Sequence, residues 1–323
     1  MERVHIVGAG GIGCAVGHAL AGAGLPVTMV EADPAKLDWG RRHGLRVDQQ
    51  PALPAELVRF ADWSPPQGAT VLLCTKCYDN PSVLERIPAS ATLVPIQNGF
   101  DPLLESRAPA LEGIASFVSE CIPATMHTRI TRPGKLHLGN RAGSGAIPSS
   151  SIVAPLLRSP LFRTEVVPNI LPYKHTKLMY NAAISPLAAA AGIDNGQLLS
   201  VAVARRLFFA LLRENYAILH GAGIELARIG PFHPATVQRI LKHRLVARCL
   251  AWAFYPSLRG TYCSMAGDLP KGRTEIDYYN GHLIALAGDR PCPLNRRVCD
   301  LVKRLERERA VAGVAVLEEL EKG

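Results

Sequence analysis

The chain has 323 residues, of which 48% are hydrophobic and 20% are charged, and its formal net charge at pH 7 is +9. This length predicts two domains with a large core, and no apolar run reaches the roughly 20 residues that a membrane span needs. The Lys and Arg residues are spread along the chain without interleaved aromatic residues, and the first residues lack a leader pattern. We therefore expect a cytoplasmic protein whose partners are neither membranes nor nucleic acids.

The beginning of the chain has the order strand, glycine-rich turn, helix and strand. An apolar strand at 4–7 leads into a turn that matches GxGxxG, formed by Gly8, Ala9, Gly10, Gly11, Ile12 and Gly13. Gly8 permits the tight turn, Gly10 lets a pyrophosphate approach the backbone, and Gly13 lets the helix pack closely on the sheet. Glu31 ends the second strand, where a carboxylate accepts hydrogen bonds from ribose hydroxyls. The pattern predicts a dinucleotide site, and the alternative is a tight turn that binds nothing.

Strand and helix patterns alternate as far as residue 168 and predict a Rossmann-like, doubly wound sheet over residues 1–168. The further strands are expected at 71–74, 92–96, 114–121, 135–138 and 164–167, and the helices at 34–42, 81–86 and 149–157. The Gly- and Ser-rich segment 140–150 is predicted to be either a mobile connection or a lid.

Helical periodicity replaces this alternation from residue 169 onward. Helices are expected at 169–192, 201–222, 233–243, 273–288 and 294–309. The predicted fold class is therefore α/β, an N-terminal Rossmann-like doubly wound sheet over 1–168 followed by an all-α C-terminal domain over 169–323.

The eight cysteines are scattered through apolar segments, as buried free thiols would be in a reducing compartment. Cys74 and Cys77 form a CxxC, but no second CxxC or CxxH pair stands near enough to complete a zinc site. The motif also ends a strand instead of opening a helix after one. We therefore predict no metal site and no redox role for this motif.

Two polar clusters stand out in the second half of the chain. Lys177, Asn181 and Ser185 are spaced at i, i+4 and i+8 on an otherwise apolar helix, so they share one face. Buried polar groups need partners, so this face is either a functional site or a solvent-facing stripe. The second cluster consists of Ser264, Asp268, Arg273, Thr274, Glu275, Asp277 and Asn280. Its TxxD at 274–277 predicts a capping box, which leaves Glu275 unexplained.

A family resemblance rests on motifs spread over nearly the whole chain. They are GAGGIG at 8–13, LLCTKCYD at 72–79, PIQNG at 95–99, KLMYNAAISPLAA at 177–189, Asn195-Gly196, SMAGD at 264–268 and TEIDYYNG at 274–281. In this order, from residue 4 to about residue 304, they resemble the ketopantoate reductase family. The resemblance implies a nicotinamide-dependent reductase of a 2-oxo acid, with a site between the domains that closes on ligand and a helical domain that also forms a homodimer.

The resemblance also implies roles for individual residues. Lys177 would be the general acid that protonates the carbonyl oxygen as hydride arrives at its carbon. Lys76 would lie at the cofactor, and Asn98 near the nicotinamide ribose and the reacting carbon. Glu275 would reach cofactor or substrate, which makes Lys177, Asn98 and Glu275 the expected catalytic residues. The residues expected to hold the substrate are Asn181, Ser185, Asn195 and Ser264.

Three departures from the family pattern bear on cofactor and substrate. Members that use NADPH typically have an Arg where this chain has Glu31, and a carboxylate about 4 Å from a 2′-phosphate would be repelled by roughly 1–4 kcal/mol. This favours NADH, with NADPH possible if Lys36, Arg41 or Arg42 swings toward the phosphate. Ser185 replaces a second substrate-binding Asn, and the segment 268–275 is one residue shorter than in the family.

Three functions are therefore in competition. The first is a nicotinamide-dependent reductase of a 2-oxo acid, with ketopantoate as the named candidate. The second is an NAD-dependent D-2-hydroxyacid dehydrogenase of the same fold acting on branched or aromatic 2-oxo acids, which Glu31 and Ser185 favour. The third is a non-catalytic dinucleotide-sensing protein, against which Lys177 weighs because a sensor needs no proton donor.

Overall fold

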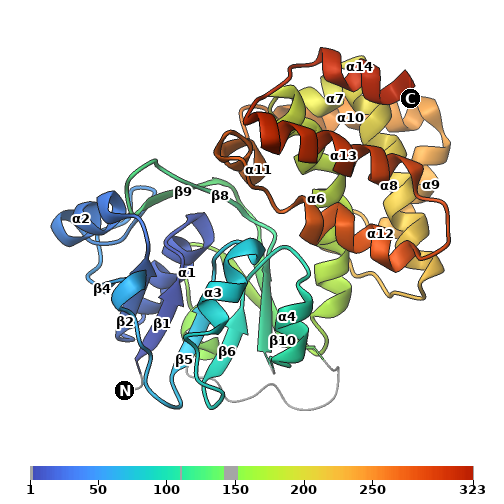
Figure 1. Ribbon diagram of the computed structural model, residues 1–323. Coiled ribbons are helices and arrows are strands. Elements are labelled where there is room, and N and C mark those ends of the chain that lie inside the picture. The colour runs from blue at the N-terminus through green and yellow to red at the C-terminus, as the bar shows by residue number, and fades with distance from the viewer. Residues whose placement is uncertain (1–2, 110, 142–151, 323) are drawn as a thin grey trace. The chain divides into compact units, whose positions relative to one another are not determined.

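The computed structural model describes residues 3–109, 111–141 and 152–322. The chain divides into two compact units, Met1–Ile170 and Leu171–Gly323. The first unit is built of strands and helices, whereas the described part of the second contains only helices (Figure 1). The predicted fold class is confirmed. None of the described helices is long and apolar enough to cross a membrane.

A five-stranded parallel sheet is the centre of the first unit. Its strands lie in the order β4-β2-β1-β5-β6, with β1 at Val4–Val7, β2 at Val27–Glu31, β4 at Glu56–Arg59, β5 at Thr70–Leu73 and β6 at Thr92–Pro95. The surrounding helices include α1 (Gly11–Gly22), α2 (Pro34–His43), α3 (Asn80–Leu84) and α4 (Pro102–Ser106). Ile6 and Val7 of β1 belong to separate buried clusters, because neighbouring side chains point to opposite faces of the sheet. The strand order reverses at β1 and β5, and ligands bind at such a switch point in doubly wound folds.

Two smaller sheets complete the first unit. One has the order β11-β10-β7 and the other β3-β9-β8. Their strands are β3 (Arg46–Val47), β7 (Leu111–Ala115), β8 (Val118–Cys121), β9 (His127–Arg132), β10 (Lys135–Asn140) and β11 (Arg163–Val167). The prediction of one strand over 114–121 is wrong, because the chain leaves one sheet after Ala115 and enters the other at Val118. Between them the buried Phe117 stacks on Phe162, with ring centroids 4.8 Å apart.

The sequence patterns missed β3, β4 and β9 of the first unit, which are short or polar. The predicted helix at 149–157 is observed as α5 (Val153–Leu157), and residues 149–151 lie outside the described part. The candidate lid at 140–150 also lies outside the described residues from position 142 onward.

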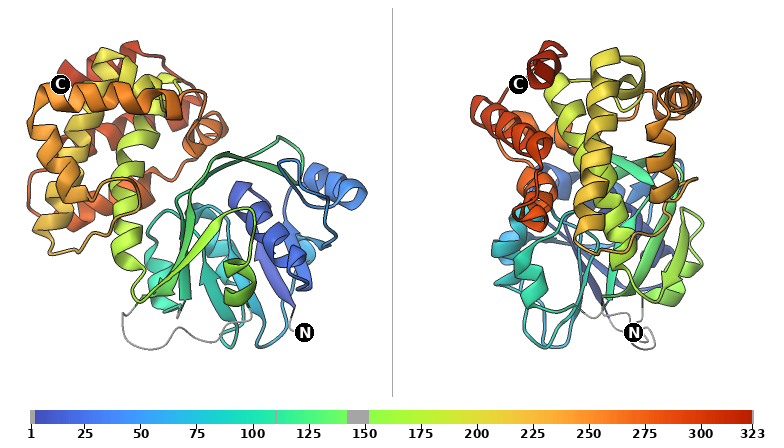
Figure 2. Two further views of the ribbon diagram at one scale, coloured as in Figure 1. Left: turned by 180° about the vertical axis from the view of Figure 1, so that it is seen from behind. Right: turned by 90° about the vertical axis from the view of Figure 1, so that its right-hand side faces the viewer.

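The helix α6 (Leu171–Ala191) is the central helix of the second unit (Figure 2). It packs against α8, α11, α13 and α14. The other helices are α7 (Gln197–Ser200), α8 (Ala202–Gly221), α9 (Pro234–Lys242), α10 (Arg244–Leu258), α11 (Ser264–Asp268), α12 (His282–Ala287), α13 (Pro293–Glu308) and α14 (Ala315–Lys322). Of these, α7, α10, α11 and α14 were not predicted.

The predicted helix at 273–288 needs a correction at its beginning. The segment starts with a π-helix, η4 (Asp277–Gly281), and continues as α12. The predicted capping box is not formed, because the Thr274 N–H donates to the buried Glu306 carboxylate at 2.7 Å and the Asp277 carboxylate pairs with Lys303. The Thr274 hydroxyl accepts instead from the N–H of Ile276 at 3.2 Å. The carboxylate of Glu306, which is distant in the chain, thus accepts the hydrogen bond that the capping box assigned to Asp277.

A chain of buried side-chain amides connects four elements of the second unit. Asn280 of η4 donates to the Ala182 carbonyl of α6 and to Asn295 Oδ1 of α13, both at 2.9 Å. Asn295 donates to Asn215 Oδ1 of α8 at 2.8 Å, and Asn215 donates to the Met179 carbonyl of α6 at 3.0 Å. All three amides are fully buried. The loss of one would leave buried partners unpaired, at a cost of about 1–3 kcal/mol each.

The glycine-rich turn that connects β1 to α1 depends on two close backbone approaches. Gly8 has a φ of +98°, and a Cβ on it would lie 2.9 Å from the backbone nitrogen of Thr75. A Cβ on Gly13 would lie only 1.9 Å from the carbonyl oxygen of Gly8. Around Gly10, by contrast, a Cβ would meet nothing within 4 Å among the described residues.

We predict that Gly13→Ala lowers the free energy of unfolding by about 1–3 kcal/mol or more, because α1 must move away from β1 to admit the methyl group. Gly10→Ala is the matched control and should change it by less than about 1 kcal/mol, since its surroundings are open. Urea titrations of both variants and the parent give the comparison. Equal stability of the two variants would contradict the packing role of Gly13.

Candidate active site

The start of α1 offers backbone N–H groups at the carboxyl end of β1. Gly10 is the N-cap residue, no side chain caps the helix, and its first turn carries no acidic residue. The first N–H groups of a helix lack partners within the helix and attract anions. Together with the open space around Gly10, this arrangement fits the diphosphate of a dinucleotide.

The carboxylate of Glu31 lies directly against this turn. Its Oε2 accepts hydrogen bonds from the Ala9 N–H at 3.1 Å and from Lys36 Nζ at 3.3 Å. Its Oε1 accepts from the N–H groups of Ala32 at 2.8 Å and Asp33 at 3.1 Å. The end of β2 therefore holds a fixed negative charge beside the glycine-rich turn, at the position where the adenosine ribose is expected.

Of the three basic residues that could offset the charge of Glu31, Lys36 is the one that contacts its carboxylate. Its Nζ also donates to the Ala9 carbonyl at 3.0 Å. Burial opposes its charge, but the Glu31 carboxylate holds the pKa of Lys36 above its ordinary value. Arg41 and Arg42 bond instead to the side chain and the carbonyl of Asp38.

Lys76 and Asn98 follow β5 and β6, and both are half-buried. A reciprocal amide pair holds the two loops together. Gln97 Nε2 donates to the Thr75 carbonyl and to Asn80 Oδ1, both at 2.8 Å, and Asn80 Nδ2 donates to Gln97 Oε1 at 3.2 Å. The neighbours of Lys76 and Asn98 in the chain are thus fixed to each other. Sequence reasoning missed this pair, because Asn80 is the first residue of α3, Gln97 stands two residues after β6, and no local pattern links the two positions.

The polar face of α6 is partly buried. Lys177 and Asn181 are half-buried, and Ser185 is only 6% exposed. Burial raises the pKa of the adjacent Tyr180 to about 12, so this phenol stays neutral in the physiological range. The ammonium, amide and hydroxyl groups are therefore partly removed from water, and electrostatic interactions between such groups are stronger than in bulk solvent.

The remaining predicted residues of the second unit differ in their surroundings. Glu275 is 4% exposed and accepts a hydrogen bond from the Tyr279 hydroxyl at 3.1 Å. Asn195 is bound within the unit, because its Nδ2 donates to Thr261 Oγ1 at 3.1 Å. Ser264 is exposed at the first position of α11, which packs on α6. The structure thus brings the helix of Ser264 to the helix of Lys177, whereas the amide of Asn195 is bonded to Thr261.

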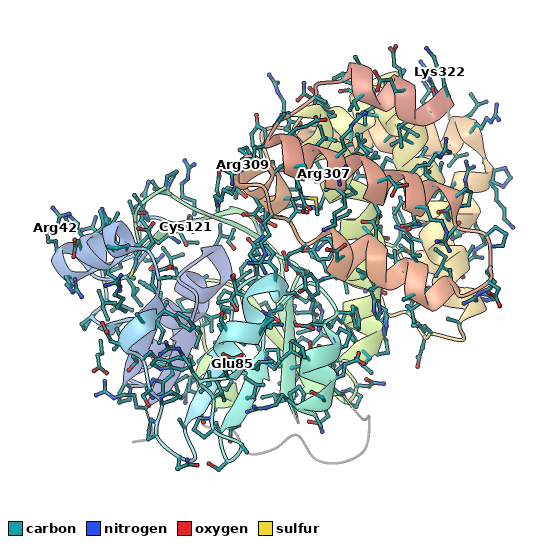
Figure 3. All side chains as sticks on the ribbon, in the orientation of Figure 1. Arg42, Glu85, Cys121, Arg307, Arg309 and Lys322 are labelled. Carbon is teal, nitrogen blue, oxygen red and sulfur yellow. The ribbon has the colours of Figure 1, made fainter. Side chains whose placement is uncertain are left out.

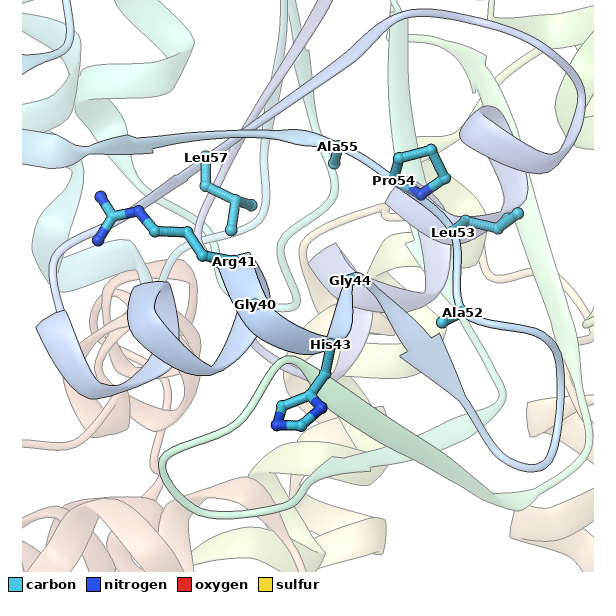
Figure 4. A pocket seen from close by; sticks show the side chains of 9 residues that line it. All are labelled: Gly40, Arg41, His43, Gly44, Ala52, Leu53, Pro54, Ala55 and Leu57. Carbon is cyan, nitrogen blue, oxygen red and sulfur yellow. The ribbon is translucent and has the colours of Figure 1, made fainter.

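A cavity of about 460 Å³ lies elsewhere in the first unit, at the C-terminal end of α2 (Figure 4). It is lined by Gly40, Arg41, His43, Gly44, Ala52, Leu53, Pro54, Ala55 and Leu57. None of the predicted site residues lines it, so it does not define the candidate active site. No group of three or more His, Cys, Asp or Glu side chains that could hold a metal ion occurs among the residues that the structure describes.

Comparisons with known proteins find relatives that match nearly the whole length of the chain. It is 26% identical over 316 residues to the 2-dehydropantoate 2-reductase of Archaeoglobus fulgidus, which covers 95% of this chain and 98% of that protein. The structure of a PanE/ApbA family ketopantoate reductase from Ralstonia eutropha superposes with a TM-score of 0.73 at 24% identity, over 95% of this chain and 99% of that one. D-mandelate dehydrogenase in complex with NADH superposes with a TM-score of 0.75 at 20% identity, over 96% and 100% of the two chains.

Two family models match the chain in the order of its units. The one described as ketopantoate reductase PanE/ApbA matches residues 4–145, and its C-terminal counterpart matches residues 169–306. Together they cover most of both units, and so this chain belongs to the ketopantoate reductase family.

Proposed function

We propose that this protein reduces a 2-oxo acid to the 2-hydroxy acid with a nicotinamide cofactor, and that ketopantoate is its first candidate substrate. The observation that supports this best is the fixed carboxylate of Glu31 beside an open glycine-rich turn, in a chain that also carries Lys177 on the apolar helix α6. The relatives named 2-dehydropantoate 2-reductase are the source of the candidate substrate.

The first unit would bind the cofactor. The N–H groups at the start of α1 would hold the diphosphate, and Glu31 would accept hydrogen bonds from the ribose hydroxyls. Lys76 and Asn98, on the two loops that Gln97 fixes, would contact the nicotinamide half. When bound, the reduced nicotinamide supplies the hydride.

The second unit would bind the substrate and move the proton. Lys177 would donate a proton to the carbonyl oxygen, and its charge would stabilise the alkoxide that develops there. Asn181, Ser185, Asn195 and Ser264 would hold the carboxylate and hydroxyl groups, and Glu275 would orient substrate or cofactor. The partial burial of Lys177 would limit water near the ammonium group, which strengthens this stabilisation.

A second candidate is an NAD-dependent D-2-hydroxyacid dehydrogenase that acts on branched or aromatic 2-oxo acids. Glu31 favours it through its charge, and Ser185 favours it because a hydroxyl leaves more space than an amide. A panel of 2-oxo acids assayed with NADH and NADPH separates the two candidates. A protein that binds dinucleotide but turns over no member of the panel would instead be a sensor.

We propose a cytoplasmic location, because all eight cysteines are free thiols, as is usual in a reducing compartment. Only three of them are buried, and Cys249 is exposed, so the expectation that all would be buried is wrong.

We predict that Lys177→Ala lowers kcat by at least about a hundredfold while the dinucleotide Kd is nearly unchanged, because general acid catalysis contributes about 10²–10⁴. Lys177→Arg should also be poor, since a guanidinium releases its proton too weakly and differs in shape. Lys242→Ala, on the exposed end of α9, is the matched control and should retain parental kcat. Near-parental turnover of Lys177→Ala would remove Lys177 from the mechanism.

We predict that the parent binds NADH more tightly than NADPH by roughly five- to several-hundredfold, because about 1–4 kcal/mol of repulsion between Glu31 and the 2′-phosphate separates the two. Glu31→Ala should remove this preference, since it frees Lys36 to meet the phosphate. The double variant Glu31→Ala, Lys36→Ala should then lose the gained NADPH affinity. The NADPH dissociation constants of the parent, the two single variants Glu31→Ala and Lys36→Ala, and the double variant measure this as a double-mutant cycle. A parent that prefers NADPH would refute the role of Glu31.

We propose that the protein is a homodimer that associates through α10. Leu245 and Trp252 of this helix are 78% and 81% exposed, share one face with the exposed Cys249, and form an apolar surface that a monomer seldom leaves open. We predict that the parent is a dimer by light scattering and that Trp252→Glu is a monomer. Leu103→Glu, at an exposed position of α4, is the control and should remain dimeric. A monomeric parent would exclude this interface.

A further inference from the structure

Two cysteines lie beside the glycine-rich turn and have no part in the proposed reaction. Cys121 is the last residue of β8 and is half-buried (Figure 3), whereas Cys14, in the first turns of α1, is fully buried. The Cys121 Sγ is 3.7 Å from the carbonyl oxygen of Ala9, the same oxygen that accepts from Lys36 Nζ. The side chain of Cys121 therefore contacts the turn at Ala9, the residue whose N–H donates to the Glu31 carboxylate.

The strand β8 lies directly on the start of α1. A Cβ on Gly11 would lie 2.7 Å from the carbonyl oxygen of Ser119. Cys14 is three residues after Gly11 and therefore on the same face of α1, the helix that contacts β8, and the two thiols are close enough for each to shift the pKa of the other. The Cys121 Sγ also lies 3.2 Å from the Thr125 carbonyl oxygen and 3.7 Å from that of Ile122, which leaves the thiol in a defined position.

The charges around this thiol pair favour one of the two thiolates. The neighbouring Cys14 thiol lowers the pKa of Cys121 to about 7; burial and the Glu31 carboxylate oppose this shift, and the Lys36 ammonium supports it. Conversely, the neighbouring Cys121 thiol and burial raise the pKa of Cys14 well above its ordinary value. Burial raises the pKa of Cys74 to about 12, so that thiol stays protonated. A thiolate is the reactive form of cysteine, and Cys121 is therefore the nucleophile of the pair.

We propose that Cys121 and Cys14 form an oxidisable dithiol site at the glycine-rich turn, that low-molecular-weight disulfides are its substrates, and that its oxidation weakens dinucleotide binding. The last part rests on the proposed function, because it assumes that the turn binds a dinucleotide. The site needs no access to Cys14 from solvent, since only the half-buried Cys121 has to meet the reagent.

The chemistry is a thiol–disulfide exchange in two steps. The Cys121 thiolate attacks one sulfur of the small disulfide, the S–S bond of the reagent breaks, and one small thiolate leaves and takes up a proton. Cys14 then gives up its proton and attacks the Cys121 sulfur of the mixed disulfide, and the second small thiolate leaves. The small disulfide is reduced to two thiols, and the pair Cys14–Cys121 is oxidised by two electrons.

Either product would alter the turn. A mixed disulfide on Cys121 places a bulky group at Ala9, beside the carboxylate of Glu31 and the ammonium of Lys36. An intramolecular disulfide removes the thiol from the Ala9 carbonyl and draws β8 and the first turns of α1 together. Dinucleotide bound at the turn should conversely shield Cys121.

The test treats the folded protein with oxidised glutathione at pH 7.4, in a Cys249→Ser background so that the exposed cysteine does not react. Intact mass and peptide mapping should show a Cys14–Cys121 disulfide. Cys14→Ser should stop at a glutathione adduct on Cys121, and Cys121→Ser should leave Cys14 reduced. Bound NADH should slow the oxidation of Cys121. Oxidation should in turn raise the NADH Kd by at least about tenfold, as expected for the loss of one charge-assisted contact.

Two outcomes would overturn the dithiol site: Cys121 stays reduced while other cysteines react, or the parent accumulates the adduct without linking to Cys14. An unchanged NADH Kd after complete oxidation would overturn its effect on binding. The peptide mapping needs neither cofactor nor turnover, so a reduced parent that binds no dinucleotide would refute the proposed function and leave the dithiol site to be judged by the mapping alone.

Discussion

The close approach of α1 to β1, with Gly13 against the carbonyl oxygen of Gly8, is the constraint on which the first unit depends. It places the start of the helix over the carboxyl end of the strand, and it exposes the Ala9 N–H to the carboxylate of Glu31. It also sets where β8 packs, because the strand contacts the same helix start at Gly11. The proposed diphosphate site, the proposed ribose contact of Glu31 and the position of the Cys121 thiol therefore all rely on one backbone contact that only glycine permits.

In both units, buried amides next to the proposed functional residues hold them in place. Gln97 and Asn80 join the loops that carry Asn98 and Lys76, and they are 3% and 0% exposed. In the second unit, the amide of Asn280 bonds to a carbonyl of α6, one residue after Asn181 in the chain. Such buried amide donors favour a single arrangement of the backbone, since any other would leave them unpaired.

The sequence predicted the fold class, because the glycine-rich turn and the long periodic helices carry strong local signals. It failed where tertiary contacts decide. The edge strand β4 has a charged residue at each end, β9 is rich in polar residues although it lies between β3 and β8, and α10 exposes its apolar residues, which hides its periodicity. The predicted capping box at Thr274 does not form, because the Thr274 N–H donates instead to the carboxylate of Glu306, a residue far along the chain. For the same reason the spacing of Lys177, Asn181 and Ser185 was visible in the sequence, whereas the pairing of Gln97 with Asn80 was not.

The amide chain through Asn280, Asn295 and Asn215 also determines how the second unit comes apart. It links η4, α13, α8 and α6 through bonds that are inaccessible to water until the helices separate. Opening any one helix therefore breaks bonds that belong to two others, so the unit resists fraying element by element and behaves as one cooperative block. Slow fluctuations of α6, and with them excursions of Lys177, are suppressed to the same degree as complete opening of the bundle.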